Sequence, residues 1–147
     1  MTRGGFGATS RPMSRPSVED TIAELEDALA FFDEEDDRYR YLMDLGRELA
    51  PLAPEERTEA NRVTGCQSRV WLVSGREGER LRFRAASDAA FVSGVLAMLL
   101  RIFDDRRAEE ILAADPGFLQ RLGLSLSRRN GALAVVNRMR AAASLDG

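Results

Sequence analysis

The sequence predicts an α+β domain, in which a small antiparallel β-sheet of about three strands packs against helices. Apolar residues recur at helical spacing in the first third of the chain and again after residue 87, whereas residues 69–74 are rich in β-formers and residues 79–84 alternate between apolar and charged. A length of 147 residues, 44% of them hydrophobic, is typical of a single domain with a substantial core. We expect that domain to cover residues 17–147.

Residues 1–16 differ in composition, and we expect a disordered N-terminal tail there. The segment contains arginines, prolines and glycines, but no acidic residue and no apolar run like that of a signal peptide. Met13 is an alternative start, so the sequence leaves open whether residues 1–12 belong to the native protein.

Two helices are expected before the hairpin. Ser17 is a suitable N-cap for the first helix. The apolar residues that follow it at helical spacing are Val18, Ile22, Leu25, Leu29 and Phe32. The acidic run at residues 33–37 is expected to be a solvated turn, and the second helix to cover residues 37–49 before Pro51.

The central segment predicts a β-hairpin. Its strands are expected at residues 69–74 (RVWLVS) and 79–84 (ERLRFR), joined by a turn that contains Gly75 and Gly78. The first strand is apolar on both faces, so we expect it to be the more central one and Trp71 to be a core residue. A short further strand is expected at residues 61–63.

Helical segments are expected after the hairpin. An apolar helix capped by Ser87 or Asp88 should run to about Phe103. The expected starts of the three later segments are Asp105 as the cap of a helix over residues 106–113, Pro116, and Ser127 as the cap of the last helix.

The composition excludes several classes of function. All 21 basic residues are arginines and there is no histidine, so lysine Schiff bases, phosphate-loop lysines, Cys–His pairs and histidine-ligated zinc are impossible. A net charge of −3 does not fit a nucleic-acid-binding protein. No apolar stretch is long enough to span a membrane. We therefore expect no cofactor, no metal, no nucleic-acid partner and no membrane partner.

Cys66 is the single cysteine, and it carries the only nucleophilic sulfur. A lone thiol fits a reducing, cytoplasmic compartment better than an extracellular one. A lone cysteine is more often a small buried residue than a reactive one. Cys66, however, follows Gly65 in a polar loop and precedes Gln67 and Ser68, a setting in which function is common. The residues alone leave both roles open.

Residues 61–72, NRVTGCQSRVWL, resemble the signature of the SufE family of sulfur acceptors. Three further blocks agree in order, namely residues 40–46 (RYLMDLG), residues 87–89 (SDA) before a helix that contains Gly94, and residues 127–131 (SRRNG). The similarity covers residues 17–143 without large gaps. It implies a SufE-like fold.

The resemblance implies that Cys66 takes persulfide sulfur from a pyridoxal-phosphate-dependent cysteine desulfurase of the SufS/CsdA type. The protein would stimulate that desulfurase and pass the sulfur to an iron–sulfur scaffold complex of the SufBCD type. It would be a sulfur carrier and activator rather than an enzyme. Two alternatives stay open, a protein-interaction module with a structural Cys66 and a CsdE-like acceptor that feeds another recipient. The oligomeric state is also open, with a homodimer among the alternatives.

The resemblance further implies roles for residues around Cys66. Arg128 is expected to stabilise the thiolate, because a nearby cation favours the charged form of a thiol. Asp88 is expected to set the conformation of the cysteine loop and to cap its helix. Gly65, Gln67 and Ser68 are expected to shape the loop or to hydrogen-bond near the thiol, and the loop to move between a sheltered and a donor-facing position.

Overall fold

The computed structural model describes residues 15–145, and it confirms the α+β class. Its elements in chain order are α1 (Val18–Ala30), α2 (Glu35–Gly46), the 3₁₀ turn η1 (Pro54–Glu56), β2 (Val70–Glu77), β3 (Arg80–Ser87), α3 (Ala90–Phe103), β4 (Arg106–Arg107), α4 (Ala108–Ala113), the 3₁₀ turn η2 (Pro116–Arg121) and α5 (Leu126–Ser144).

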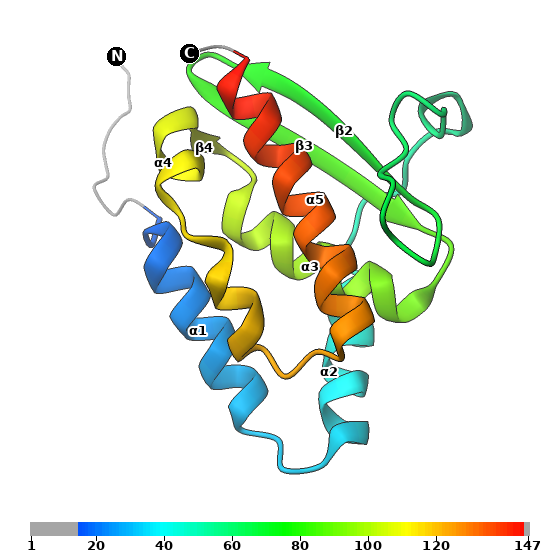
Figure 1. Cartoon of the computed structure of the whole chain (residues 1–147), viewed down its shortest axis with the longest axis vertical. Coiled ribbons are helices and arrows are strands. Elements are labelled where there is room, and N and C mark those ends of the chain that lie inside the picture. The colour runs from blue at the N-terminus through cyan, green and yellow to red at the C-terminus, as the bar shows by residue number, and fades with distance from the viewer. Residues whose placement is uncertain (1–14, 146–147) are drawn as a thin grey trace, which may run out of the picture.

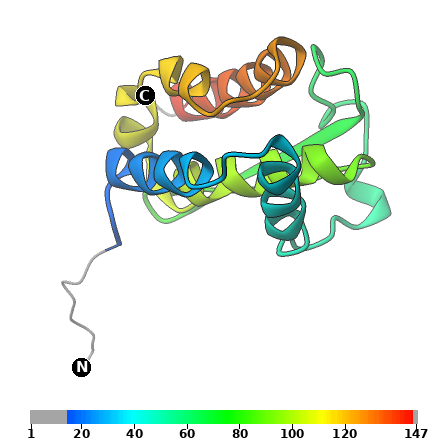
Figure 2. The ribbon, with the colours of Figure 1, turned by 90° about the horizontal axis from the view of Figure 1, so that it is seen from below.

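Helix α3 lies at the centre of the fold. It contacts β3 as well as α1, α2 and α5, and Met98 in its middle is fully buried. Figure 1 shows α5 running in front of the β2–β3 hairpin, η2 between α5 and α1, and α2 at the end of the molecule away from the hairpin turn. The view from below in Figure 2 shows α2 lying across the direction of α1. The hydrophobic core therefore fills the space between the sheet and the helices.

The sheet has three antiparallel strands in the order β2-β3-β4. Strand β2 pairs with β3 from Val70 opposite Ser87 to Glu77 opposite Arg80, so the predicted hairpin is confirmed with longer strands. The turn between them is two residues long, and Gly78 takes a φ of 63°, in the left-handed region that glycine tolerates best. The third strand, Arg106–Arg107, lies where the sequence predicts the start of a helix.

The prediction that the first hairpin strand is central is wrong, because β3 holds the middle of the sheet. Residues 61–63 do pair with β2 on its other edge, through an isolated bridge between Arg62 and Trp71. On the face of β2 that points away from the main core, Trp71 packs on Leu52 and Ala86 in a small separate cluster. Leu52 belongs to the loop between α2 and η1, so this loop covers the apolar side chain of Trp71.

Two predicted turns and caps around α2 and α4 differ from the structure. Three residues of the acidic run, Glu35–Asp37, form the first turn of α2, where carboxylates interact favourably with the helix dipole. Asp105 caps no helix, because its φ is 61° and its N–H donates to the carbonyl of Leu81, which extends the pairing of β4. Helix α4 starts only at Ala108.

The predicted caps of α3 and α5 are also wrong. Helix α3 has Ala89 at its N-cap with no side-chain capping bond, and the Ser87 hydroxyl accepts the N–H of Ala89 instead. Helix α5 begins two residues earlier than predicted. Its N-cap is Ser125, whose hydroxyl accepts the N–H of Arg128, so Ser127 lies inside the first turn.

Most of the predicted N-terminal tail lies outside the described residues. Its last two residues are described, and both contact the fold. Arg15 donates to the carbonyl oxygens of Asp104, Asp105 and Arg101, and the carbonyl of Pro16 accepts from Arg106. These bonds attach the start of the described chain to the C-terminal end of α3.

Helices α2 and α3 cross at two glycines. A Cβ atom on Gly94 would collide with the backbone carbonyl of Leu42, and one on Gly46 would lie 2.8 Å from the backbone nitrogen of Gly94. Because these neighbours are backbone atoms, they cannot move away as a flexible side chain would. The crossing therefore requires both glycines.

We predict that Gly94→Ala forces α2 and α3 apart and lowers the free energy of unfolding by about 1–3 kcal/mol, the usual effect of overpacking. Urea denaturation monitored by circular dichroism measures it. Gly75→Ala is the matched control, because a Cβ there meets nothing within 4 Å and its stability should stay within about 0.5 kcal/mol of wild type. Equal stability of the two variants would contradict the role of the glycine crossing.

Candidate functional site

Cys66 lies in a pocket of about 130 Å³ between its own loop, the start of α3 and the first half of α5. We call residues 64–69 the Cys loop. The side of the pocket formed by the helices is mostly apolar. The lining residues are Cys66, Gln67, Ser68, Val70, Ala89, Phe91, Val92, Val95, Leu96, Ser127, Arg128, Gly131, Ala132 and Val135.

A short ladder of backbone hydrogen bonds closes the base of the Cys loop. The N–H of Val63 donates to the carbonyl of Val70 at 2.9 Å, and the N–H of Leu72 donates to the carbonyl of Asn61 at 2.8 Å. Gly65 takes a φ of 95°, a conformation that side-chain-bearing residues rarely adopt. The ladder and this glycine together direct the chain so that Cys66 turns back toward α5.

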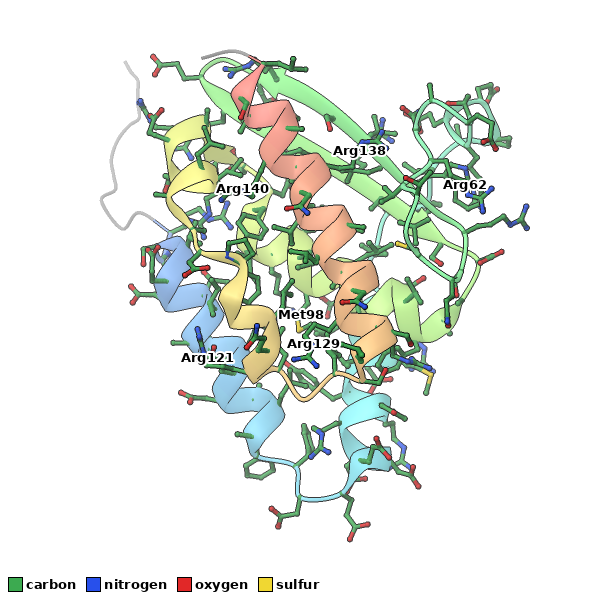
Figure 3. The ribbon with its side chains drawn as sticks, viewed as in Figure 1. Arg62, Met98, Arg121, Arg129, Arg138 and Arg140 are labelled. Atoms are coloured by element: carbon green, nitrogen blue, oxygen red, sulfur yellow. The ribbon has the colours of Figure 1, made fainter. Side chains whose placement is uncertain are left out.

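Helix α5 holds the loop from the other side. A Cβ on Gly131 would lie 3.5 Å from the Cys66 sulfur, an ordinary van der Waals distance, so the sulfur lies directly beside this turn of the helix. Two turns further along α5, Arg138 donates from Nη1 to the carbonyl of Arg62 at 2.8 Å and from Nη2 to the carbonyl of Ala60 at 3.0 Å. Figure 3 shows Arg138 and Arg62 on the same side of α5. The segment that leads into the Cys loop, residues 60–62, is therefore tied to α5 by charge-assisted hydrogen bonds.

The Cys66 thiol is half-buried and has one hydrogen-bond partner in the described part of the chain. Its S–H donates to the backbone carbonyl of Gly131, with 3.5 Å between sulfur and oxygen. Burial raises the pKa of the Cys66 thiol above its ordinary value, because an apolar environment disfavours the charged form, and the charge of Arg62 opposes this rise. In this conformation burial favours the neutral thiol over the thiolate.

The far end of the Cys loop is fastened to the start of α3. The Arg69 guanidinium donates from Nε to a carboxylate oxygen of Asp88 at 2.9 Å, and this ion pair lowers the pKa of Asp88. The Ser87 hydroxyl donates to the carbonyl of Arg69 at 2.7 Å. Asp88 thus contacts the loop instead of capping the helix. Trp71, a core residue as predicted, packs under the Arg69 guanidinium, which lies 5.5 Å from its ring centre.

Arg128 lines the same pocket as Cys66, but its guanidinium lies on an aromatic ring. It stands 3.8 Å from the ring centre of Phe91 and 5.6 Å from that of Tyr39. Within residues 15–145, no hydrogen bond joins Arg128, Gln67 or Ser68 to the thiol through a side chain. The structure therefore gathers Gln67, Ser68 and Arg128 in the pocket of Cys66, with Asp88 paired to the Cys loop, and among residues 15–145 the Gly131 carbonyl alone accepts a hydrogen bond from the sulfur.

Sequence analysis missed the residues that hold the site together. Arg138 and Arg62 are among many arginines in the sequence, and nothing local distinguishes them. Phe91 and Tyr39 lie within helical segments, where an aromatic side chain does not differ in pattern from ordinary packing residues. Only the helical spacing from Gly131 to Arg138, which places both on one face of the last helix, offered a signal.

The profile of the SufE family, described as an Fe-S metabolism associated domain, matches residues 23–143. The chain belongs to the SufE family. Uncharacterized SufE-like proteins of Rhizobium meliloti and Rhizobium etli are each 37% identical to it, over 132 and 129 residues. These matches cover 84% of this chain and 94% of the first relative, and 82% and 87% for the second.

A solved structure shares the fold. The solution structure of a hypothetical protein from Thermus thermophilus superposes with a TM-score of 0.67 at 20% identity, covering 85% of this chain and 94% of that one. SufE membership implies a sulfur-transfer role in Fe–S metabolism and a cysteine desulfurase as partner. No helix within residues 15–145 has both the length and the apolar character needed to cross a membrane.

We predict that Arg138→Met loosens the start of the Cys loop, because two carbonyl oxygens lose their charged donor. Unfolding free energy should fall by about 1–3 kcal/mol. Hydrogen exchange in residues 58–69 and the alkylation rate of Cys66 by a neutral reagent should both rise.

Arg140→Met is the matched control. Arg140 lies on the same helix and donates to the carbonyl oxygens of Ile111, Leu112 and Ala114 at the end of α4 (Figure 3). Its loss should destabilise the fold to a similar extent without changing Cys66 alkylation. Equal alkylation rates in the two variants would show that Arg138 does not act on the Cys loop.

Proposed function

We propose that this SufE-family protein accepts persulfide sulfur on Cys66 from a pyridoxal-phosphate-dependent cysteine desulfurase of the SufS/CsdA type. It stimulates the desulfurase by removing that sulfur, and it passes the sulfur to an Fe–S scaffold complex of the SufBCD type in the cytoplasm. The protein is a carrier and activator rather than an enzyme, since the desulfurase performs the cleavage of cysteine. The observation that carries this proposal is the placement of the only thiol in a half-buried pocket.

The transfer is a thiol exchange that needs one nucleophilic sulfur. The Cys66 thiolate attacks the outer sulfur of the donor persulfide, and a new S–S bond forms at Cys66 as the donor's S–S bond breaks. The electron pair of the broken bond leaves with the donor cysteine, which becomes a thiolate. The proton of the Cys66 thiol is released before the attack. No net oxidation or reduction occurs, so no resolving cysteine is required.

The pocket supports storage of the product. A cavity needs about 10–15 Å³ to hold one water-sized group, and the pocket measures about 130 Å³. An extra sulfur atom on Cys66 fits there, against Val92, Val95 and Val135. Burial among these side chains shelters the persulfide from soluble reductants. Delivery to a donor or recipient then requires the Cys loop to move outward.

The contacts around the pocket support roles for the other predicted residues. Gly65 supplies the backbone conformation at the tip, while Gln67 and Ser68 form the polar wall of the pocket. Asp88 holds the loop through Arg69, so this ion pair must open when the loop moves. Arg128 supplies a positive charge for the anionic sulfur during transfer.

We predict that Cys66→Ser abolishes sulfur acceptance. Incubation of the wild-type chain with a desulfurase and cysteine should add the mass of one sulfur atom or more, and the serine variant should gain none. Intact-protein mass spectrometry measures the gain. The stability of the variant should stay within about 0.5 kcal/mol of wild type, as for most substitutions outside the packed core.

Three results bear on the proposal and its alternatives. A mass gain that survives in Cys66→Ser would exclude Cys66 as the acceptor. Absence of any gain in the wild-type chain, together with tight binding to the desulfurase, would indicate an interaction module with a structural cysteine. A chain that takes up sulfur but fails to deliver it to the scaffold complex would indicate a CsdE-like acceptor with another recipient.

We predict that Arg128→Ala leaves the fold intact and slows sulfur acceptance by about tenfold, the effect of one pKa unit on the thiolate fraction. The measurement is alanine production by the desulfurase in the presence of each variant. Arg107→Ala is the control, because Arg107 pairs with Glu79 at the far end of the hairpin. Full stimulation by Arg128→Ala would remove Arg128 from the transfer step.

A further inference from the structure

Arg128 has an aromatic environment that the transfer reaction itself does not explain. Its guanidinium lies 3.8 Å from the ring centre of Phe91 and 5.6 Å from that of Tyr39, and the two rings meet edge to face at 4.8 Å. Tyr39 comes from α2, Phe91 from α3 and Arg128 from α5. Three separate helices therefore meet to build this contact.

We propose that Phe91 and Tyr39 form an aromatic seat that holds Arg128 away from the Cys66 sulfur in the resting protein and releases it when sulfur is transferred. The release, though not the resting contact, rests on the function proposed above. The seat makes Phe91 and Tyr39 positioning residues for Arg128. Neither of them touches the sulfur through a hydrogen bond, so neither is a catalytic residue.

The geometry of the resting state supports the seat. The thiol donates to the carbonyl of Gly131 and is therefore in its neutral form, which offers no charge to attract a guanidinium. The face of Phe91, by contrast, attracts a cation through the negative potential of its ring. Tyr39 is itself fixed, because its hydroxyl donates to a carboxylate oxygen of Glu35 at 3.0 Å. The carboxylate of Glu35 adds a further negative charge on the α2 side.

The other arginines near Cys66 already have charged or polar partners. Arg69 pairs with Asp88 at the far end of the Cys loop, and Arg138 donates to two backbone carbonyls. Arg62 acts on the thiol electrostatically and lies 3.7 Å from a carboxylate oxygen of Glu59. Arg128 lines the pocket without an ion pair in the described part of the chain. It is thus the cation available to move toward the sulfur.

The strength of the contact suits a releasable seat. A cation–π contact biases a side chain between two positions by about 2- to 30-fold, depending on how far it is desolvated. A thiolate or persulfide carries a full negative charge inside a half-buried pocket, where charges interact more strongly than in water. The seat therefore favours the resting position only while the sulfur is neutral.

The test is the pH dependence of Cys66 alkylation by iodoacetamide, a neutral reagent, in the isolated full-length chain. Phe91→Leu keeps an apolar pocket wall but removes the aromatic face, so Arg128 can reach the sulfur. We expect alkylation at neutral pH to rise about threefold or more and the apparent pKa to fall, in line with the bias of a cation–π contact. Phe91→Tyr keeps the face and should match wild type. Tyr39→Leu, which removes the more distant ring, should give a smaller rise.

The double variant Phe91→Leu/Arg128→Ala separates the seat from a trivial widening of the pocket. It should match Arg128→Ala alone, which has no cation to move toward the sulfur and should therefore alkylate no faster than wild type. Fast alkylation that persists in the double variant would overturn the proposal, as would an unchanged profile in both Phe91→Leu and Tyr39→Leu. Thermal melts verify that each variant is folded.

These measurements use no desulfurase, so they fail or succeed independently of sulfur acceptance. If Cys66 never gains sulfur mass but the seat variants behave as expected, the proposed function is wrong and the seat stands. If sulfur is accepted but the seat variants do not alter alkylation, the seat is wrong and the proposed function stands.

Discussion

The attachment of the Cys loop to α5 is the constraint on which the rest of the site depends. The Cys66 thiol donates to the carbonyl of Gly131, and Arg138 ties the segment that leads into the loop to the same helix face. Helix α5 can serve as this platform because α3 supports it from within the core, and α3 in turn packs closely on α2 through Gly94 and Gly46. A change at the helix crossing would therefore reach the thiol through two packed interfaces.

Burial and charge act on Cys66 in opposite directions, and burial prevails in the resting conformation. The pKa of the thiol is raised although Arg62 lies near enough to lower it. A neutral thiol is a poor nucleophile, so Cys66 is poorly reactive in this conformation. Reactivity then has to come from a change of environment, either outward movement of the Cys loop or the approach of a further cation.

The fold class and the choice of Cys66 as the candidate site residue could both be obtained from the sequence, because periodicity and a specific motif are local signals. The errors arose where tertiary contacts decide. Arg106 was expected in a helix, but its buried guanidinium bonds to Thr21 and to backbone carbonyls, and the backbone there pairs with β3 instead. Asp88 is a residue type that often caps helices, yet its carboxylate pairs with the Arg69 guanidinium, a stronger hydrogen-bond donor than a free backbone N–H at the start of α3. The partners of Arg128 and Arg138 come from distant segments, so no local pattern indicates them.

The absence of histidine and lysine limits how the ionisation of the Cys66 thiol can be controlled. Every basic side chain is an arginine, which stays charged at all physiological pH values. The pKa of Asp88 is lowered further by its ion pair, so that carboxylate also stays charged near neutral pH. Protonation of a neighbouring side chain therefore cannot switch the ionisation of Cys66 in this range. The burial of the sulfur and its distance from a permanently charged guanidinium are the remaining variables, and both change only when a loop or an arginine side chain moves. Contacts that hold arginines in place, such as that of Arg128 with the ring of Phe91, therefore influence how readily the Cys66 thiol ionises.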